Sequence, residues 1–411
     1  MKMNRGLKIV IIAFAIITTT AWMAQAERFT YTYTAGEKYR ILSTVQQTVL
    51  INGRLSHTAE LLNRIAVSVD KVKAGSGPGS HGESGHIVAD FQASEEARHA
   101  GQLFQWGEEY HSEFWRDSLG YYDISPKYFM PVVRNVPVFP DRDLSKGDTW
   151  SAPGQETHDF RQSFGLPDPF NFTVPVSYTY LGKESVDGRS YDAIGIDYNV
   201  FYQVPEQYTG LYPTLITGFS HQTLYWDQPH GMPYSYHEKY LFIFTLSDGT
   251  SVQYSGTAES KVTLISTMDR AKVADDIRGT LKDLGVSNTE VKTDSRGVTI
   301  SIQNIQFMPD SSELVDSEKQ KLRHIGDILK KYPERDLLIT GYTALAGTEE
   351  GRQKLSEERA AAVGQYLLSL GVRTRDHMIF RGMGARDPVA HNSTEAGRMK
   401  NRRVEITLME N

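Results

Sequence analysis

The chain has 411 residues, of which 39% are hydrophobic and 23% are charged, and it contains no Cys. The length suggests about two or three domains, and the composition is that of globular proteins rather than disordered chains. Without Cys the chain has no disulfides, no thiolate metal ligands, no cysteine nucleophile and no Cys that could carry a lipid. The net charge of -6 gives no support to nucleic-acid binding, which needs a basic surface.

Residues 1–26 have the features of an export signal. Three basic residues precede the apolar run Ile9–Ile17, and Ala24-Gln25-Ala26 then gives the small-x-small pattern that a signal peptidase cleaves. We therefore expect cleavage after Ala26 and a non-lipidated protein in the periplasm or at the periplasmic face of the outer membrane. The alternative is an uncleaved N-terminal anchor, but Thr18–Thr20 interrupts its apolar run. No later stretch approaches the roughly 20 apolar residues of a transmembrane helix.

Residues 27–267 are predicted to form an antiparallel β domain, either a barrel or a sandwich. This region is acidic and rich in aromatic residues, and its apolar residues recur with the period of two that is typical of strands. Turn sequences such as Asn52-Gly53 and Asp248-Gly249 separate the runs and predict hairpins. The alternation covers Phe29–Tyr33, Leu61–Val72, Val174–Leu181, Tyr191–Val204, Thr214–Trp226, Tyr234–Leu246 and Ser251–Ile265.

The alternation fails between Ser94 and Lys146. Here we expect a short helix around Glu95–Trp106, followed by irregular backbone in the Pro-rich stretch, and Gly75–Gly85 is expected to be a flexible loop. An outer-membrane barrel is the alternative for this region. A lipid-facing strand needs an unbroken apolar alternation, whereas charged residues fall inside several candidate strands. We therefore favour a soluble periplasmic domain.

Residues 268–411 change to a helical period. Strands and helices alternate there, which predicts a small sandwich with helices packed on one face of a sheet and makes the whole chain α+β. The second helix is expected to open with the capping box Ser317-x-x-Gln320. The expected helices are Ala271–Leu284, Glu318–Tyr332 and Glu349–Leu370, and the expected strands are Thr289–Thr293, Gly297–Ile305, Leu337–Tyr342, Met378–Gly382 and Arg403–Met409.

Three sequence blocks follow one another in this second region. They are Ile305-Gln-Phe307-x-x-Asp310-Ser311-x-x-Leu314, then Gly341-Tyr-Thr343-x-x-x-Gly347 with Leu355-Ser356-x-x-Arg359-Ala360, and finally Asn401-Arg402-Arg403-Val404-Glu405-Ile406. Together they resemble the OmpA C-terminal domain, a family shared with peptidoglycan-associated lipoproteins and flagellar-motor stator proteins. The resemblance implies a βαβαβ fold with its core at about residues 298–409, and non-covalent binding of peptidoglycan through the diamino acid of its stem peptide. Residues 27–267 resemble no family that we can name.

The resemblance also implies a ligand site, but this sequence departs from the family pattern there. In the family, an Arg holds a ligand carboxylate with its two-pronged guanidinium, and an Asp takes the ligand ammonium. The family's Arg corresponds to Arg359, and the strand end that precedes the ligand site corresponds to Thr343. The family's Asp is replaced by Ala344, and an Asn that the family usually carries is replaced by Arg352. We therefore expect peptidoglycan binding to be weak or lost. Further candidates by resemblance are Asp310, Ser311 and Asn401.

Some of these residues also have purely structural explanations. Arg359 shares a helix stripe with Leu355 and Val363, so its stem could pack while its head bonds loop carbonyls or the nearby Glu349 or Glu350. We expect Arg402 and Arg403 to pair with neighbouring acids rather than with a ligand, and Asn401 to bond the backbone.

Catalysis and a resident metal or cofactor have no support in the sequence. The His residues make no His-Glu-x-x-His spacing, and there is no Gly-x-Ser-x-Gly elbow or phosphate-binding loop. The sequence thus indicates a non-catalytic cell-envelope protein that associates weakly with peptidoglycan, with a β domain that binds another envelope protein or outer-membrane component. The alternatives are an outer-membrane barrel anchored to peptidoglycan and an envelope enzyme with its site in the β domain.

Overall fold

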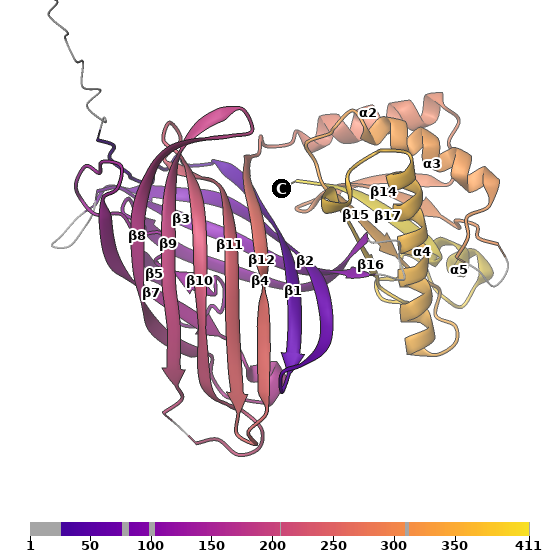
Figure 1. Ribbon diagram of the computed structural model, residues 1–411. Helices are drawn as coiled ribbons and strands as arrows, with labels where there is room; N and C mark the ends of the chain where they lie inside the picture. The colour runs from indigo at the N-terminus through magenta and orange to yellow at the C-terminus, as the bar shows by residue number, and fades with distance from the viewer. Residues whose placement is uncertain (1–25, 76–81, 98–102, 206, 309–311, 411) are drawn as a thin grey trace, which may run out of the picture.

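The computed structural model describes residues 26–75, 82–97, 103–205, 207–308 and 312–410 as an N-terminal sheet followed by a C-terminal α+β unit (Figure 1). The expected export signal lies outside the described residues apart from Ala26. The strands of the N-terminal sheet are β1 (Lys38–Ile51), β2 (Arg54–Lys73), β3 (Ser84–Ala97), β4 (Leu103–Asp117), β5 (Tyr122–Ile124), β6 (Val133–Arg134), β7 (Thr149–His158), β8 (Phe170–Val186), β9 (Arg189–Gln203), β10 (Pro213–Asp227), β11 (Met232–Leu246) and β12 (Ser251–Leu264). A short helix, α1 (Arg161–Phe164), joins β7 to β8.

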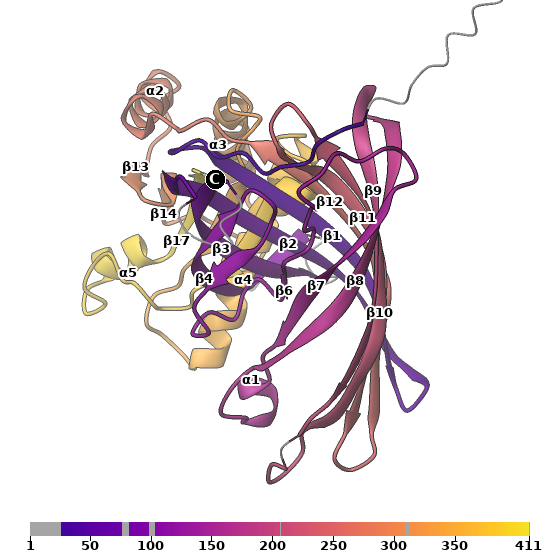
Figure 2. The same ribbon diagram turned by 90° about the vertical axis from the view of Figure 1, so that its left-hand side faces the viewer.

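The long strands form one antiparallel sheet in the order β4–β3–β2–β1–β12–β11–β10–β9–β8–β7. The sheet is strongly curved and therefore has a concave and a convex face (Figures 1 and 2). The hairpins lie where the turn sequences predict them. Between β1 and β2, for example, Asn52 and Gly53 both take the positive φ values that a two-residue hairpin turn requires, 50° and 73°.

The N-terminal sheet is not closed, so the expected barrel or sandwich is wrong. Among the described residues, no pairing joins β4 or β5 to β6 or β7. The chain between β4 and β7 is rich in Pro, which cannot donate to a strand ladder, and it forms only the short strands β5 and β6. The first part of β4 instead pairs in parallel with β16 (Met378–Gly382) of the C-terminal unit, with Ile379 opposite Phe104 and Phe380 opposite Gln105.

Two further sequence expectations are wrong in this region. The stretch Glu95–Trp106 is not a helix where it is described, because its ends belong to β3 and β4. Its Leu103 and Phe104 are almost fully buried against the C-terminal unit, and this packing outweighs the local helical preference. The Phe29–Tyr33 segment forms no strand. Gly75–Gly85 falls mostly outside the described residues.

The N-terminal segment instead packs across the concave face of the sheet (Figure 2). Phe29 and Tyr31 are buried, and they meet Phe139 from the Pro-rich stretch and Trp226 from β10. The ring centroids of Tyr31 and Trp226 lie 4.9 Å apart, and those of Phe139 and Trp226 lie 4.8 Å apart, both edge to face. This aromatic cluster fills one end of the concave face and leaves the rest of that face to other side chains.

The C-terminal unit has the predicted architecture, a sheet with helices on one face. Its sheet order is β13–β14–β17–β15–β16, with β15 and β16 parallel and the other neighbours antiparallel. Apolar residues of the helices and strands form one core between the two layers. The elements are α2 (Arg270–Asp283), β13 (Thr289–Asp294), β14 (Gly297–Gln303), α3 (Asp316–Leu329), β15 (Leu337–Gly341), α4 (Glu349–Ser369), the 3-10 turn η2 (Arg375–His377), β16, α5 (Glu395–Asn401) and β17 (Arg403–Met409).

The helix ends differ from the expectation at α3. This helix begins at Asp316, and the residue before it, Val315, has no side chain that could accept a capping hydrogen bond. Ser317 lies inside the helix, so the expected capping box does not start it. By contrast, Thr348 caps α4 by accepting a hydrogen bond from the backbone N–H of Gly351. In the described part of the chain, no helix combines the length and apolar character needed to cross a membrane.

The second face of the C-terminal sheet packs on the convex face of the N-terminal sheet. Leu338, Ile379 and Met409 from the C-terminal strands form one buried cluster with Leu62 of β2 and Phe104 of β4. Because side chains alternate along a strand, these residues face away from the helices on one side and away from the concave face on the other. The two sheets are therefore joined by this shared apolar core as well as by the backbone pairing of β4 with β16.

A buried carboxylate lies at the edge of this apolar cluster. Asp336, directly before β15, is fully buried and contacts Arg40 Nη1 of β1 at 2.8 Å, Arg64 Nε of β2 at 2.6 Å and His377 Nδ1 at 2.6 Å. Both arginines are themselves buried. Burial by itself opposes ionisation of Asp336, but Arg64, the His377 bond and Arg40 hold its pKa below the usual range. Asp336 is therefore an ionised group between two cations that belong to the other sheet.

We predict that Asp336→Asn lowers the free energy of unfolding by about 3–5 kcal/mol, because removing one partner leaves two buried, uncompensated guanidinium groups. Urea unfolding of the full chain, followed by circular dichroism, measures this loss. Asp275→Asn is the matched control, since Asp275 and Arg278 form an exposed pair whose loss should cost less than about 1 kcal/mol. Equal effects of the two substitutions would contradict the role given to Asp336.

The same carboxylate predicts a pH dependence of stability. Its pKa is lower in the folded protein than in the unfolded chain, so the unfolded state binds a proton first as the pH falls. The stabilisation should be complete above the ordinary Asp pKa of about 4 and should decline progressively below it. Urea midpoints measured across this range should fall more steeply for the natural chain than for Asp336→Asn, and parallel curves would refute the assignment.

Candidate functional site

The site that the sequence predicts lies where the end of β15 meets α4. Gly341 at the end of β15 packs against the backbone carbonyl of Ser356, and a Cβ at this glycine would lie 2.0 Å from that oxygen. The Ser356 hydroxyl accepts a hydrogen bond from the backbone N–H of Gly384 at 2.9 Å. These two close contacts fix α4 against the end of β15, and Thr343 and Ala344 follow directly after that strand end.

Arg359 lies on α4 one turn beyond Ser356 and has no acidic partner among residues 26–75, 82–97, 103–205, 207–308 and 312–410. Its guanidinium carbon lies 5.0 Å from the centroid of the Phe307 ring, a cation–π contact. Its Nε is buried without a hydrogen-bond partner, and among the described residues no hydrogen bond or ion pair joins Arg359 to Glu349 or Glu350. The structural alternative, in which those acids or loop carbonyls hold the Arg head, therefore gains no support from the described contacts.

The electrostatic surroundings of Arg359 are positive. Burial lowers its pKa, and the charge of Arg402 lowers it further. Arg402 is itself paired with Glu395 at 2.6 Å, and Arg403 with Glu405 at 2.8 Å, as expected from the sequence. Arg359 is thus the guanidinium of this group that is left without a carboxylate.

Thr343 and Ala344 occupy the opposite side of the site. Both are buried, and the backbone N–H of Thr343 donates to the carbonyl of Gly384 at 2.8 Å. The Thr343 hydroxyl has no hydrogen-bond partner. Ala344 supplies only a methyl group, so this side of the site offers a hydroxyl but no carboxylate.

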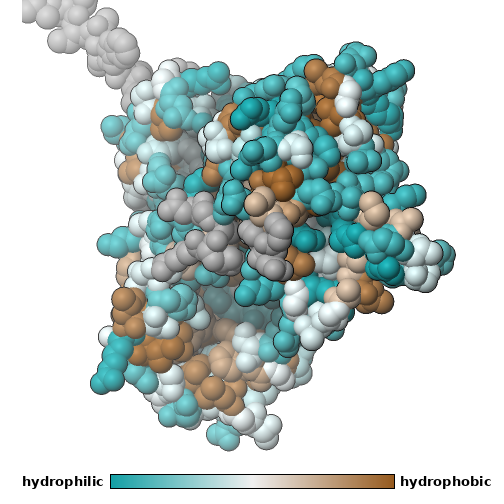
Figure 3. Space-filling model, turned by 90° about the vertical axis from the view of Figure 1, so that its right-hand side faces the viewer, coloured by the Kyte–Doolittle hydropathy of each residue, from teal (hydrophilic) through white to brown (hydrophobic). Residues whose placement is uncertain are grey.

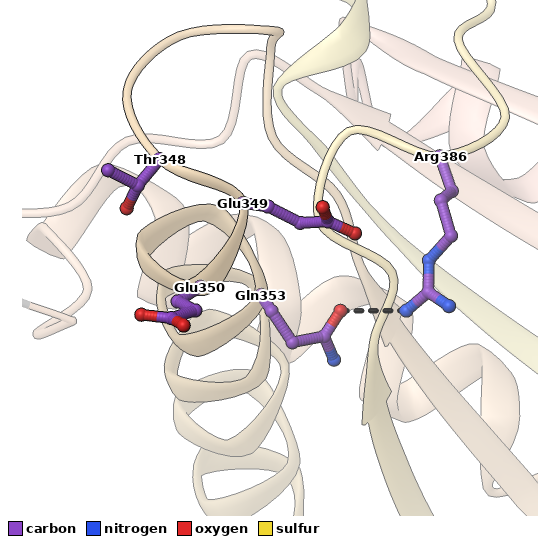
Figure 4. Close-up of a pocket in the computed structure, with 5 residues that line it drawn as sticks. All are labelled: Thr348, Glu349, Glu350, Gln353 and Arg386. Atoms are coloured by element: carbon purple, nitrogen blue, oxygen red, sulfur yellow. Dashed lines mark hydrogen bonds between the residues drawn. The ribbon is translucent and has the colours of Figure 1, made fainter.

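The start of α4 carries a separate polar pocket (Figure 4). Glu349 and Glu350 line it together with Gln353, whose Oε1 accepts a hydrogen bond from Arg386 Nη2 at 2.7 Å. Glu349 precedes Arg359 by ten positions, which corresponds to about 15 Å along the helix axis. Arg352 bends back to the carbonyl of Gly347, so its charge lies at the start of the helix rather than beside Arg359.

Of the three remaining candidates, Asn401 has a structural role, and Asp310 and Ser311 are not among the described residues. Asn401 is buried at the end of α5, where its Oδ1 accepts from the backbone N–H groups of Val389 and Ala390 and its Nδ2 donates to the Ala390 carbonyl. It bonds the backbone, as the sequence suggests.

The described residues of the site offer hydrogen-bond donors to an anion and no carboxylate to a cation. The unpaired Arg359 guanidinium and the free Thr343 hydroxyl are suited to a carboxylate. An ammonium group would meet no acid at Ala344 and would be repelled by Arg359 and Arg402. Sequence reasoning missed the contact of Phe307 with Arg359 and the bond between Gln353 and Arg386, because neither spacing nor residue type signals them. Among the described residues, no group of three or more acidic or His side chains is arranged to hold a metal ion.

Comparison with known proteins identifies this part of the chain. Residues 306–402 match the OmpA family and are an OmpA-like domain. The peptidoglycan-binding protein ArfA of Mycobacterium tuberculosis (strain ATCC 25618 / H37Rv) is 39% identical over 104 residues, which cover 25% of this chain and 32% of ArfA. The Escherichia coli (strain K12) protein named probable lipoprotein YiaD is 33% identical over 141 residues, 34% of this chain and 61% of its own length.

A solved structure of an outer membrane protein from Borrelia burgdorferi B31 aligns with 36% sequence identity and a TM-score of 0.25, over 29% of this chain and 96% of that chain. The matched regions span less than two thirds of the length of ArfA and of YiaD. The family match leaves the N-terminal sheet unassigned.

We predict that Thr343→Val raises the free energy of unfolding by about 1 kcal/mol, because it removes a buried hydroxyl that lacks a partner. Thr407→Val is the matched control. Its hydroxyl is bonded to that of Thr299 at 2.8 Å, and its loss should destabilise the chain by about 1 kcal/mol. Urea unfolding of both variants tests the assignment, and a loss of stability in Thr343→Val would show that this hydroxyl has a partner.

Proposed function

We propose that this chain is a non-catalytic cell-envelope protein whose OmpA-like domain associates with peptidoglycan weakly, at an altered ligand site. The resemblance of residues 306–402 to the OmpA family supports the association with the cell wall. The name of the relative ArfA, a peptidoglycan-binding protein, supports the same assignment. The proposal places the protein at the periplasmic side of the envelope, with the N-terminal sheet available to a second envelope component.

The observation that carries the weak binding is that Ala344 occupies the family's Asp position while Arg359 has no carboxylate partner in the described part of the chain. The site keeps the group that binds the ligand carboxylate and lacks the group that binds the ligand ammonium. Removing water from an ammonium without giving it a new hydrogen-bond partner makes the free energy of binding less favourable by about 1–3 kcal/mol or more. Because each 1.4 kcal/mol changes the affinity about tenfold, the domain should hold a diaminopimelate stem peptide at least about tenfold more weakly than one with the Asp in place.

Sedimentation with purified diaminopimelate-containing sacculi tests this proposal. We expect little of the full mature chain to pellet, and we expect Ala344→Asp to increase the bound fraction at least about tenfold at low protein concentration. Adding Arg352→Asn should increase binding further if the charge of Arg352 acts at this distance. Ala346→Asp is the matched control, because it adds the same charge to an exposed position of the same loop and should not improve binding.

Two results would contradict the proposal. One is strong pelleting of the natural chain that is abolished by Arg359→Ala, since the site would then bind this ligand without the Asp. The other is equal gain from Ala344→Asp and Ala346→Asp, since the added charge would then act without occupying the site.

A further inference from the structure

A cavity of about 380 Å³ lies on the concave face of the N-terminal sheet, away from the OmpA-like site. Side chains alternate along each strand, so every second residue of β11 faces this cavity while His237 and Lys239 face outward. A second hollow of about 560 Å³ adjoins it and shares Ser43, Asn63 and Tyr236 among its lining residues. Each volume is in the range of small-molecule sites. The space-filling view shows the molecule hollowed below the C-terminal unit, with hydrophobic residues gathered beneath the recess (Figure 3).

Aromatic rings form much of the wall of the first cavity. They come from β9, β11 and β12, where β10 lies between β9 and β11, and the sheet register brings them to one surface. Aromatic faces carry partial negative charge and attract cations over the ring. The rings are those of Tyr198, Tyr236, Tyr240, Phe242, Phe244 and Tyr254.

Two carboxylates lie in this aromatic wall. Glu156 is 1% exposed, and its oxygens accept a hydrogen bond from the Tyr198 hydroxyl at 2.7 Å and lie 3.1 Å from His158 Nε2. Glu238 accepts hydrogen bonds from Ser220 at 2.7 Å and from Gln222 at 3.3 Å, both on Oε1, and no described residue donates to its Oε2. Burial raises the pKa of Glu238, the two hydrogen bonds lower it, and the charge of Glu156 raises it.

No permanently charged cation lines either hollow, and the one His in the described linings is His158, which lies against Glu156. No Lys or Arg is among the described residues that line either hollow, whereas the second hollow adds Glu108 and Asp159. Asp159 is already paired with Arg161 and Glu108 accepts from the Tyr110 hydroxyl, but neither partner brings a positive charge to the lining. The concave face therefore combines an excess of negative charge with apolar walls.

Unpartnered buried polar atoms point to the same kind of occupant. The first is Glu238 Oε2, to which no described residue donates. The Ser260 hydroxyl is also buried without a partner, and Ser260 lies in register between Ser43 and Tyr236, which line both hollows. Both oxygens can accept a hydrogen bond from a ligand.

We propose that the concave face binds a small organic cation, an amine carried on an apolar body. The ammonium would donate to Glu238 and lie against the aromatic rings, and the apolar body would replace water along the wall. A cation is favoured over a neutral ligand because it compensates carboxylates that are already partly desolvated. A fatty acid or another anion is disfavoured because it would meet the same carboxylates without a positive partner. This site is independent of the proposed peptidoglycan association.

Three probes that share one indole body test the charge preference by isothermal titration calorimetry with the full chain. Tryptamine carries an ammonium, tryptophol a hydroxyl and indole-3-propionate a carboxylate. We expect tryptamine to bind about tenfold more tightly than tryptophol, and indole-3-propionate to give no measurable heat of binding. Tighter or equal binding of the hydroxyl or carboxylate probe, or no binding of any of the three, would overturn the proposal.

Substitutions locate the binding to this cavity. Glu238→Gln should weaken tryptamine binding about tenfold, and Tyr240→Leu about threefold, the size expected for one cation–π contact. Glu259→Gln is the matched control, because Glu259 lies on the convex face with its side chain 77% exposed and should leave the affinity unchanged. Thermal unfolding checks that each variant is folded. Unchanged affinity in folded Glu238→Gln and Tyr240→Leu would overturn the assignment to this site.

Discussion

The buried contact of Asp336 with Arg40 and Arg64 fixes how the two sheets of this protein meet. The ladder between them is short, with Ile379 and Phe380 opposite two residues of β4, and a ladder of that length does not by itself define an orientation. The Asp336 carboxylate lies between guanidinium groups from two different strands, β1 and β2, and each of its oxygens contacts one of them. Charged hydrogen bonds of this kind are strong only at particular distances and angles, so they constrain the position of Asp336 relative to both strands. Compared with an apolar replacement, such a buried ionic group contributes little net stability, so its main effect here is to specify one arrangement of the sheets.

That arrangement leaves both candidate binding surfaces free of the interface. The helices cover one face of the C-terminal sheet, and the N-terminal sheet covers the other. Arg359 lies on one of these helices and contacts Phe307 of its own unit. The cavity with Glu156 and Glu238 lies on the concave face, whereas the interface uses the convex one. In its described part, the protein therefore presents two surfaces of opposite charge, one with the Arg359 guanidinium and one with the carboxylates of Glu156 and Glu238.

The sequence is informative wherever the structure depends on local pattern. Period-two alternation locates β8 to β12, and Met378–Gly382 and Arg403–Met409 coincide with β16 and β17. The failures are elements that depend on distant partners. The Glu95–Trp106 stretch is polar enough to suggest a helix, but its two ends pair with each other as parts of β3 and β4, and Phe104 and Gln105 also pair with the distant β16. Likewise, the motif identifies Arg359 and Ala344, but only the fold shows that the Thr343 hydroxyl is unpartnered, and only the order of strands brings Glu156 and Glu238 to one cavity.

The parallel pairing of β4 with β16 also has a consequence for the chain during synthesis. β4 leaves the ribosome when more than half of the chain is still to be made, so the apolar surface around Leu62 and Phe104 waits for its cover. Edge strands that wait in this way are where incomplete chains associate with one another. The C-terminal strands therefore cover an apolar surface of the N-terminal sheet that is exposed until they are made.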